Sequence, residues 1–171
     1  VGLSIGGLIA LELIRQRPNL CNKLILSDTA PKIGSKDMWA NRIKLVQDRG
    51  IEAISDDILA RWFSSSFLKD NVDELQMWRS MLIRTTKAGY IGCCDAISRC
   101  DLTEQAKLIN IPTLVMVGDE DGSTPVNLVK EGANLIDGSI FKVIKKAGHL
   151  PCVEQPNEVA SIFLQFLENN T

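Results

Sequence analysis

Residues 1–7 read Val1-Gly2-Leu3-Ser4-Ile5-Gly6-Gly7, and this stretch decides how the fold is interpreted. Residues 2–6 fit the pattern G-x-S-x-G, in which a strand turns sharply into a helix and presents a serine at the strained turn. A helix can follow here, because residues 6–16 are apolar on nearly every side and Pro18 would end it. Such a helix is predicted to be buried. A glycine- and serine-rich turn without any chemistry is the alternative.

The segments that follow alternate between short apolar runs and longer periodic ones. Lys23–Asp28 and Thr113–Gly118 have the composition of buried parallel strands, and Ser139–Lys145 is expected to form a third strand. Helical patterns cover residues 126–136 and the C-terminal stretch, where we expect Asn157 to be the N-cap. Strands that alternate with helices indicate a parallel sheet covered on both faces. The sequence therefore predicts an α/β fold with a mostly parallel sheet.

Residues 36–100 contain no comparable strand and show helical spacing instead. Apolar side chains recur at helical intervals in three successive groups, which are Trp39, Ile43 and Val46, then Ile51, Ile54, Ile58 and Trp62, then Leu75, Trp78 and Leu82. This pattern predicts three or four amphipathic helices inserted between two strands of the sheet. We therefore expect core segments at 1–35 and 101–171, separated by a helical insertion at 36–100.

The composition narrows the possible partners. The 171 residues carry 19 Lys and Arg against 21 Asp and Glu, and this formal net charge of −2 favours neither a nucleic acid nor a membrane partner. No apolar stretch approaches the roughly 20 residues of a membrane span. The five cysteines form no C-x-x-C pair, so we expect free thiols and a reducing, cytoplasmic location. With a single histidine and no paired cysteine ligands, we expect no metal site.

Two loops place polar side chains beyond the carboxyl ends of expected strands, where parallel sheets bind their ligands. Residues 119–125 read Asp-Glu-Asp-Gly-Ser-Thr-Pro, and residues 146–151 read Lys-Ala-Gly-His-Leu-Pro. A serine nucleophile needs a base within hydrogen-bond reach, and that base needs a third group that fixes its tautomer. We therefore predict a catalytic triad of Ser4, Asp121 and His149.

Other residues compete for the same roles. Asp119 and Glu120 lie close to the strand end, so we expect them to be solvated loop charges, whereas Asp28 after the earlier strand is the alternative acid. His149 is the only histidine, although a lone histidine is more often a residue without a catalytic role. Its position in a Gly-His-x-Pro loop after the last strand favours catalysis.

The chain resembles the α/β-hydrolase family over its whole length. The order serine, aspartate, histidine is the order of that family's triad. Gly118-x-x-Asp121-x-x-x-Pro125 and Gly148-His149 match its acid and histidine loops. The resemblance implies that residues 36–100 form a helical cap over the active site. It also implies that the backbone N–H of Ile5 is one donor of the oxyanion hole, and that no cofactor is needed.

Within the family, the sequence is most similar to the 3-oxoadipate enol-lactonases. The segments that carry this likeness are Asp28-Thr29-Ala30-Pro31-Lys32-Ile33-Gly34, Trp39 with Arg42 and Ile43, Arg61-Trp62-Phe63, Gly89-Tyr90-Ile91-Gly92-Cys93-Cys94 and Val153-Glu154-Gln155-Pro156. The likeness implies hydrolysis of a carboxylated enol lactone to 3-oxoadipate in bacterial aromatic catabolism. Arg61 beside Trp62 is expected to bind the carboxylate of this small-molecule substrate, because arginine pairs with carboxylates in a bidentate way. A solvated Arg61 and a core Trp62 are the alternative, and Cys93 and Cys94 are expected to be packing residues.

The sequence departs from the family at its front, where the strands before Ser4 and the loop with the second oxyanion donor are absent. We therefore expect a partial sequence, which alone would be unstable and inactive because of an unpaired strand edge. Two other functions stay open. One is a different carboxylic-ester or lactone hydrolase of the same fold, and the other is a ligand-binding relative that keeps the triad without turnover.

Overall fold

The computed structural model describes residues 1–169. Its sheet has the strand order β1-β2-β3-β4, and every neighbouring pair is parallel. The strands are β1 (Gly2–Leu3), β2 (Leu24–Ser27), β3 (Thr113–Gly118) and β4 (Ile140–Ile144). The predicted α/β fold is therefore confirmed, and the three longer strands fall where the apolar runs predict them.

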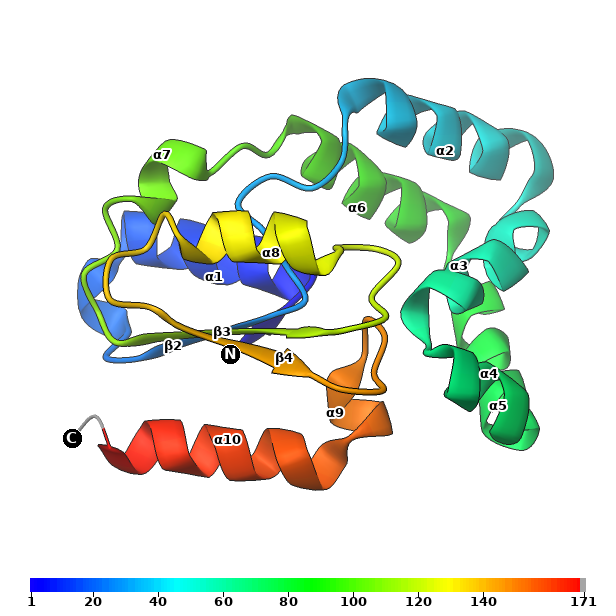
Figure 1. Ribbon diagram of the computed structural model, residues 1–171. Helices are drawn as coiled ribbons and strands as arrows, with labels where there is room; N and C mark the ends of the chain where they lie inside the picture. The colour runs from blue at the N-terminus through cyan, green and yellow to red at the C-terminus, as the bar shows by residue number, and fades with distance from the viewer. Residues whose placement is uncertain (170–171) are drawn as a thin grey trace.

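Helices cover both faces of this sheet. The helices α1 (Ile5–Gln16) and α8 (Val126–Ala133) lie on one face, and α10 (Pro156–Asn169) lies on the other (Figure 1). A strand with both faces covered has no polar side, which explains why β2 and β3 are uninterrupted apolar runs. Three short helical turns complete the core, which are Pro18–Leu20, α7 (Thr103–Ala106) and α9 (Pro151–Glu154).

The alternation of side chains along the strands divides the core into two layers. Leu26 and Val115 pack together with residues of α1 and α8, whereas Ile25 and Leu114 pack against Phe166 of α10. All five side chains are nearly inaccessible to solvent. Because successive strand residues point to opposite faces, these two layers fix the register of the sheet and hold the carboxyl ends of its strands at one edge.

Five helices lie between β2 and α7 in the chain, and we call them the cap. They are α2 (Lys36–Arg49), α3 (Ser55–Trp62), α4 (Ser65–Asp70), α5 (Val72–Ile83) and α6 (Lys87–Arg99), with a short helical turn at Glu52–Ile54. The cap lies at the end of the sheet where the strands terminate (Figure 1). The expected number of three or four helices is too small, because Ser64 accepts a hydrogen bond from the Phe67 N–H and starts a separate helix.

Two further expectations are wrong. The helix α1 is not buried all round, since Leu8 and Leu11 pack inward while Ile9 is 63% exposed and Leu13 is 41% exposed. Only one face of this helix meets the sheet and cap within the described residues. Asn157 is not an N-cap, because α10 already begins at Pro156. A proline has no N–H and a fixed φ, so it suits the first turn of a helix. Within residues 1–169, no helix is long and apolar enough to cross a membrane.

Candidate active site

The turn between β1 and α1 places Ser4 in a strained backbone conformation. Its φ is 54° and its ψ is −123°, values that a side-chain-bearing residue rarely adopts. A Cβ on Gly2 would lie 2.3 Å from the carbonyl oxygen of Gly6, so glycine at position 2 allows the tight corner. A Cβ on Gly6 would meet nothing within 4 Å, so only the first glycine of the G-x-S-x-G pattern is required by close contact.

Thr29, in the loop after β2, holds this turn from the side. Its hydroxyl donates a hydrogen bond of 2.7 Å to the carbonyl oxygen of Ser4. A Cβ on Gly7 would lie 2.4 Å from a methyl carbon of Thr29, so the glycine makes room for the threonine. Sequence reasoning did not identify this role for Thr29, because the two segments are 25 residues apart and only the fold brings them together.

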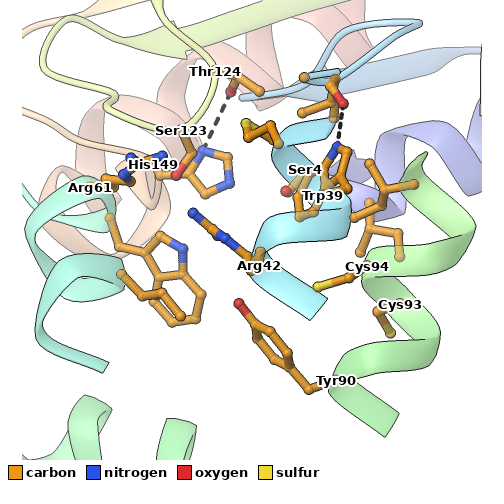
Figure 2. Close-up of a pocket in the computed structure, with 17 residues that line it drawn as sticks. Ser4, Trp39, Arg42, Arg61, Tyr90, Cys93, Cys94, Ser123, Thr124 and His149 are labelled. Carbon is orange, nitrogen blue, oxygen red and sulfur yellow. Dashed lines mark hydrogen bonds between the residues drawn. The ribbon is translucent and has the colours of Figure 1, made fainter. Parts of the chain in front are cut away.

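The loops after β3 and β4 bring Asp121 and His149 into direct contact. The Nδ1 atom of His149 lies 2.8 Å from Oδ2 of Asp121, and both side chains are almost fully buried. Since this hydrogen bond occupies Nδ1, the other ring nitrogen, Nε2, is left to act as a base. Ser4 and His149 line the same cavity (Figure 2), although no hydrogen bond joins their side chains within the described residues. Such bonds often tighten only when substrate binds.

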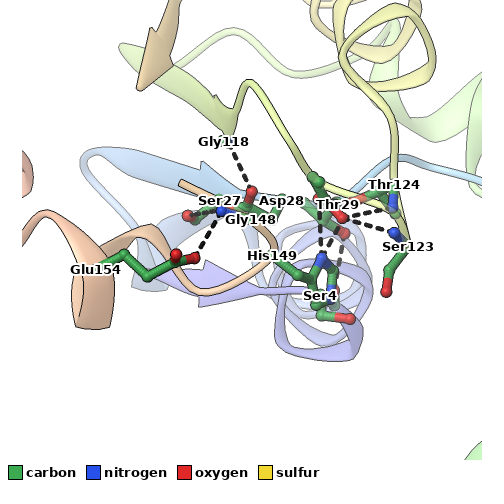
Figure 3. A network of polar contacts seen from close by, with 11 residues as sticks. Ser4, Ser27, Asp28, Thr29, Gly118, Ser123, Thr124, Gly148, His149 and Glu154 are labelled. Carbon is green, nitrogen blue, oxygen red and sulfur yellow. Dashed lines mark hydrogen bonds and ion pairs between the residues drawn. The ribbon is translucent and has the colours of Figure 1, made fainter. Parts of the chain in front are cut away.

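Asp121 has several further donors (Figure 3). The backbone N–H groups of Ser123 and Thr124 donate to Oδ1 at 2.7 and 3.0 Å, and the hydroxyl of Thr124 donates to Oδ2 at 2.7 Å. Burial would raise the pKa of Asp121, but the hydrogen bond and charge of His149 and the two bonds from Thr124 outweigh it, so the pKa is lowered. An ionised Asp121 is the form that stabilises an imidazolium.

Asp28, the alternative acid, lies behind this pair. It is completely buried, has a φ of 50°, and accepts hydrogen bonds from the Ser27 hydroxyl at 2.6 Å and from the Gly118 N–H at 2.9 Å. Burial, together with the charge of Asp121, raises the pKa of Asp28 to about 8 although these two bonds lower it. Asp28 is therefore mostly protonated at neutral pH, and within the described residues Asp121 holds the hydrogen bond to His149.

The same three groups have the composition of a metal site. One ligand atom each from Asp28, Asp121 and His149 lies within 4.8 Å of the others. However, all four carboxylate oxygens accept hydrogen bonds and Nδ1 of His149 is bonded to Asp121. A metal ion would have to displace these contacts, whereas an acid–base triad uses them as they stand.

A cavity of about 220 Å³ lies between these loops and the cap. Core residues Ser4 and His149 line it, together with the cap residues Arg42, Arg61, Trp62, Tyr90, Cys93 and Cys94 (Figure 2). The predicted substrate-binding residues Arg61 and Trp62 are thus present, with Arg61 exposed and Trp62 half-buried. The packing role expected of the two cysteines fits buried Cys94 but not exposed Cys93, and all five cysteines are free.

Backbone contacts join the end of α3 to both triad loops. The Trp62 carbonyl accepts a hydrogen bond of 2.8 Å from the His149 N–H, and the Arg61 carbonyl accepts one of 3.1 Å from the Gly122 N–H. A Cβ on Gly148 would lie 2.5 Å from the Trp62 carbonyl oxygen, so the glycine before the histidine permits this approach. The position of Trp62 is therefore fixed relative to His149.

Carboxylates add to this connection between cap and core. Glu154 accepts a hydrogen bond of 2.6 Å from the Gly148 N–H (Figure 3). It also accepts bonds from the Ser64 N–H at 3.0 Å and from the Ser64 hydroxyl. Glu120 accepts bonds of 2.8 and 2.7 Å from the N–H and hydroxyl of Ser65. Glu120 is exposed, as expected of a loop charge, and in addition it accepts hydrogen bonds from the cap.

A sequence profile of the alpha/beta hydrolase family matches residues 1–162, which is most of the chain. The chain belongs to the alpha/beta hydrolase family. As an alpha/beta hydrolase, it is 32% identical over 157 residues to 3-oxoadipate enol-lactonase 2 of Acinetobacter baylyi, a match that covers 91% of this chain and 58% of that protein.

Solved structures of the family agree in fold. The enol-lactonase of Burkholderia xenovorans LB400 superposes with a TM-score of 0.92 at 30% identity, over 98% of this chain and 64% of the other. An esterase of Thermogutta terrifontis, solved with malate bound, superposes with a TM-score of 0.90 at 28% identity. The match covers 99% of this chain and 64% of the esterase. This alpha/beta hydrolase chain therefore spans about two thirds or less of the length of these relatives.

Proposed function

We propose that this chain carries the catalytic residues of a carboxylic-ester hydrolase that opens 3-oxoadipate enol-lactone to 3-oxoadipate. The observation that carries the proposal is the buried Asp121–His149 pair, which lines the same cavity as Ser4 at its strained turn. The choice of lactone is supported by relatives that are named enol-lactonases. The substrate is a small molecule, which suits a cavity of about 220 Å³.

The proposed reaction proceeds in two acyl-transfer steps. The Ser4 hydroxyl oxygen attacks the lactone carbonyl carbon while Nε2 of His149 takes its proton, and Asp121 stabilises the imidazolium. The ring C–O bond then breaks, the enol oxygen leaves with the proton from His149, and the enol becomes a ketone. A water molecule, deprotonated by His149, attacks the acyl-enzyme and releases 3-oxoadipate with regeneration of Ser4.

The developing oxyanion needs fixed donors. Ile5 is the first residue of α1, so no carbonyl four residues earlier in the helix accepts its N–H. This N–H adjoins the nucleophile and is the proposed first donor of the oxyanion hole. The loss of one such donor typically costs about 3–4 kcal/mol of transition-state stabilisation.

Steady-state hydrolysis of the enol lactone by the full-length gene product tests the proposal. We expect turnover, and we expect Ser4→Ala to lower kcat by about 10⁴-fold or more, as removal of a triad nucleophile does. Absence of lactone opening by the wild-type protein would contradict the proposal. Binding without turnover would instead favour the ligand-binding relative as the function.

A second candidate function is hydrolysis of another ester or lactone. The 28% identity to the esterase of Thermogutta terrifontis favours it, since cap residues can set the substrate while the triad is unchanged. A panel of small esters and lactones, assayed beside the enol lactone, distinguishes the two hydrolases by their ratios of kcat/KM.

Two accompanying proposals concern the protein as a whole. A cytoplasmic location is supported by five free cysteines. Inactivity of residues 1–171 on their own is supported by β1, which has two residues and pairs only with β2 among the described strands. Measurable lactone hydrolysis by the isolated 171-residue chain would contradict the second proposal.

A further inference from the structure

Arg42, on α2, extends into the cavity toward the region where Ser4 and His149 lie (Figure 2). Its side chain is half-buried, and no carboxylate of the described residues forms an ion pair with it. A guanidinium that has lost part of its water without gaining a counter-charge is unfavourable. An anionic ligand in the cavity would supply that counter-charge.

The ring of Trp39 fixes the place of this guanidinium. The indole N–H of Trp39 donates a hydrogen bond of 2.7 Å to the buried carbonyl of Ile33, which holds the ring in one orientation. The central carbon of the Arg42 guanidinium lies 5.5 Å from the centre of this ring, within the range of a cation–π interaction. A guanidinium held in this way loses less freedom when it binds a carboxylate, which lowers the cost of binding.

Tyr90, on α6, directs its hydroxyl toward Arg42 in the same cavity (Figure 2). Burial raises the pKa of Tyr90 although the positive charge of Arg42 lowers it, so the phenol keeps its proton at neutral pH. Arg42 can only donate hydrogen bonds, and a protonated Tyr90 adds an O–H donor beside it. Such a set of donors suits a carboxylate, which accepts hydrogen bonds through both oxygens.

Arg61 occupies a different position from Arg42. It is exposed, and both arginines also line an outer hollow that Asp57 borders. Neither arginine forms an ion pair among the described residues, so burial is what separates them. An exposed cation keeps most of its water and gains less from a ligand anion than a half-buried one. Burial therefore favours Arg42 over Arg61 as the main contact for an anion in the cavity.

We propose that Arg42 and the Tyr90 hydroxyl form a carboxylate subsite, which holds the non-reacting acid end of an ester or lactone whose carbonyl lies at Ser4. This inference rests on the proposed hydrolase function and refines it. It moves the main carboxylate contact from Arg61 to Arg42, and it assigns the protein a preference for anionic acyl substrates over neutral ones of the same length.

A pair of matched esters tests the subsite in the full-length gene product. Mono-p-nitrophenyl adipate carries the carboxylate, and p-nitrophenyl hexanoate has the same chain length without it. We expect Arg42→Gln to lower kcat/KM for the adipate ester by about 10- to 100-fold, mainly through KM, as loss of a charge-assisted hydrogen bond does. The hexanoate ester should change by less than about threefold, because it makes no such bond.

Arg61→Gln is the matched control, since it removes the same group from the same cavity. We expect it to alter the ratio of the two esters by less than about threefold. The proposal is overturned if Arg42→Gln leaves the ratio of kcat/KM for the two esters unchanged, including through equal losses on both. It is also overturned if the preference for the adipate ester is lost in Arg61→Gln alone. Arg42→Lys keeps the charge, so partial retention of the preference is expected even if Arg42→Gln folds poorly.

Direct binding gives a readout that does not depend on turnover. Calorimetric titration of free adipate into the wild-type protein should give measurable affinity, and Arg42→Gln should weaken it by about tenfold or more. Equal affinity in both proteins, or no binding to either, contradicts the subsite. A protein that prefers the anionic ester but does not open the enol lactone would refute the proposed function and leave the subsite standing.

Discussion

The two sides of the cap are attached to the core in different ways. On one side, residues 61–65 at the junction of α3 and α4 are hydrogen-bonded to the loops that carry Asp121 and His149. On the other side, α2 and α6 pack on the core through apolar residues such as Trp39 and Cys94. Hydrogen bonds are directional and apolar packing is not. The first side therefore fixes the geometry of the proposed triad, while the second can change its pocket residues without moving Asp121 or His149.

This difference suits a family in which one triad serves many substrates. Arg42 and Tyr90 both belong to the side formed by α2 and α6, which we call the apolar side. A substitution there changes the cavity without breaking a hydrogen bond to the loops that carry Asp121 and His149. Trp62 belongs to the side formed by residues 61–65, which we call the bonded side. Its backbone carbonyl accepts the His149 N–H, and this bond does not depend on the side chain at position 62. Selectivity and catalysis can thus be varied separately.

The largest expected effect is on the bonded side, at Asp121. An asparagine at this position has similar size but can present an N–H to His149 and so favour the wrong tautomer. We expect Asp121→Asn to lower kcat by about 10³- to 10⁴-fold with an unchanged circular dichroism spectrum. If kcat falls by less than tenfold, Asp28 rather than Asp121 would be the acid, and an Asp28→Asn/Asp121→Asn double variant would then lose the residual activity.

The second-largest effect is expected at Asp28, whose carboxyl group is a buried neighbour of Asp121 and His149. Its pKa is about 8 in the folded protein against 3.8 as its usual value, so between these pH values the folded state holds a proton that the unfolded state has released. The stability that Asp28 contributes is fully present below pH 3.8 and is lost as the pH rises through about 8.

Asp28→Asn removes this proton equilibrium. Urea unfolding at several pH values should show the variant gaining stability relative to the wild-type protein as the pH rises, with a limiting slope of about 1.4 kcal/mol per pH unit. The titratable groups near Asp28, including Asp121, His149 and Cys152, are the same in both proteins. A difference in unfolding free energy that does not vary with pH would show that Asp28 is ionised in the folded state.

A smaller effect is expected at Glu154, which connects Ser64 to Gly148. Glu154→Gln retains the size of the side chain but loses the charge that strengthens three hydrogen bonds. We expect the free energy of unfolding to fall by about 1–3 kcal/mol and kcat to fall by about tenfold, because the loop that holds His149 loses a support. Glu158→Gln, at an exposed acid in the first turn of α10, should change neither quantity, and equal effects in both variants would remove Glu154 from this role.

The smallest effect is expected on the apolar side, at Trp39. Phenylalanine keeps most of the apolar contact but cannot donate to the Ile33 carbonyl, so we expect a stability loss of about 1–2 kcal/mol. Turnover of the neutral hexanoate ester should stay within about twofold, since no catalytic loop is bonded to this residue. A tenfold fall in kcat for that ester would show that the apolar side also holds the triad.

The sequence predicts best what is local. The strand Thr113–Gly118 was located correctly, because a strand covered on both faces is a continuous apolar run. The contact between Asp121 and His149 follows from their places after neighbouring parallel strands, which end at the same edge. The exposure of Ile9 on α1 was not predicted, since apolar composition does not show which face of a helix is covered.

The sequence gives little information on contacts between distant segments. Thr29 supports the carbonyl of Ser4, Glu154 joins Ser64 to the histidine loop, and Arg42 faces the cavity beside Trp39. Each of these residues has an ordinary local context, so its role depends on a partner that only the tertiary fold supplies. A recognisable segment around each of them was the available signal, but it did not indicate a partner.

The backbone angle of Ser4 has a consequence for how such a protein changes over generations. A serine at a φ of 54° costs the folded state roughly 1–3 kcal/mol, which glycine at the same position would largely avoid. A lineage released from selection for turnover would be stabilised by that single replacement. Ser4 therefore lowers the stability of the folded state, and selection keeps it only while its hydroxyl is needed for a reaction.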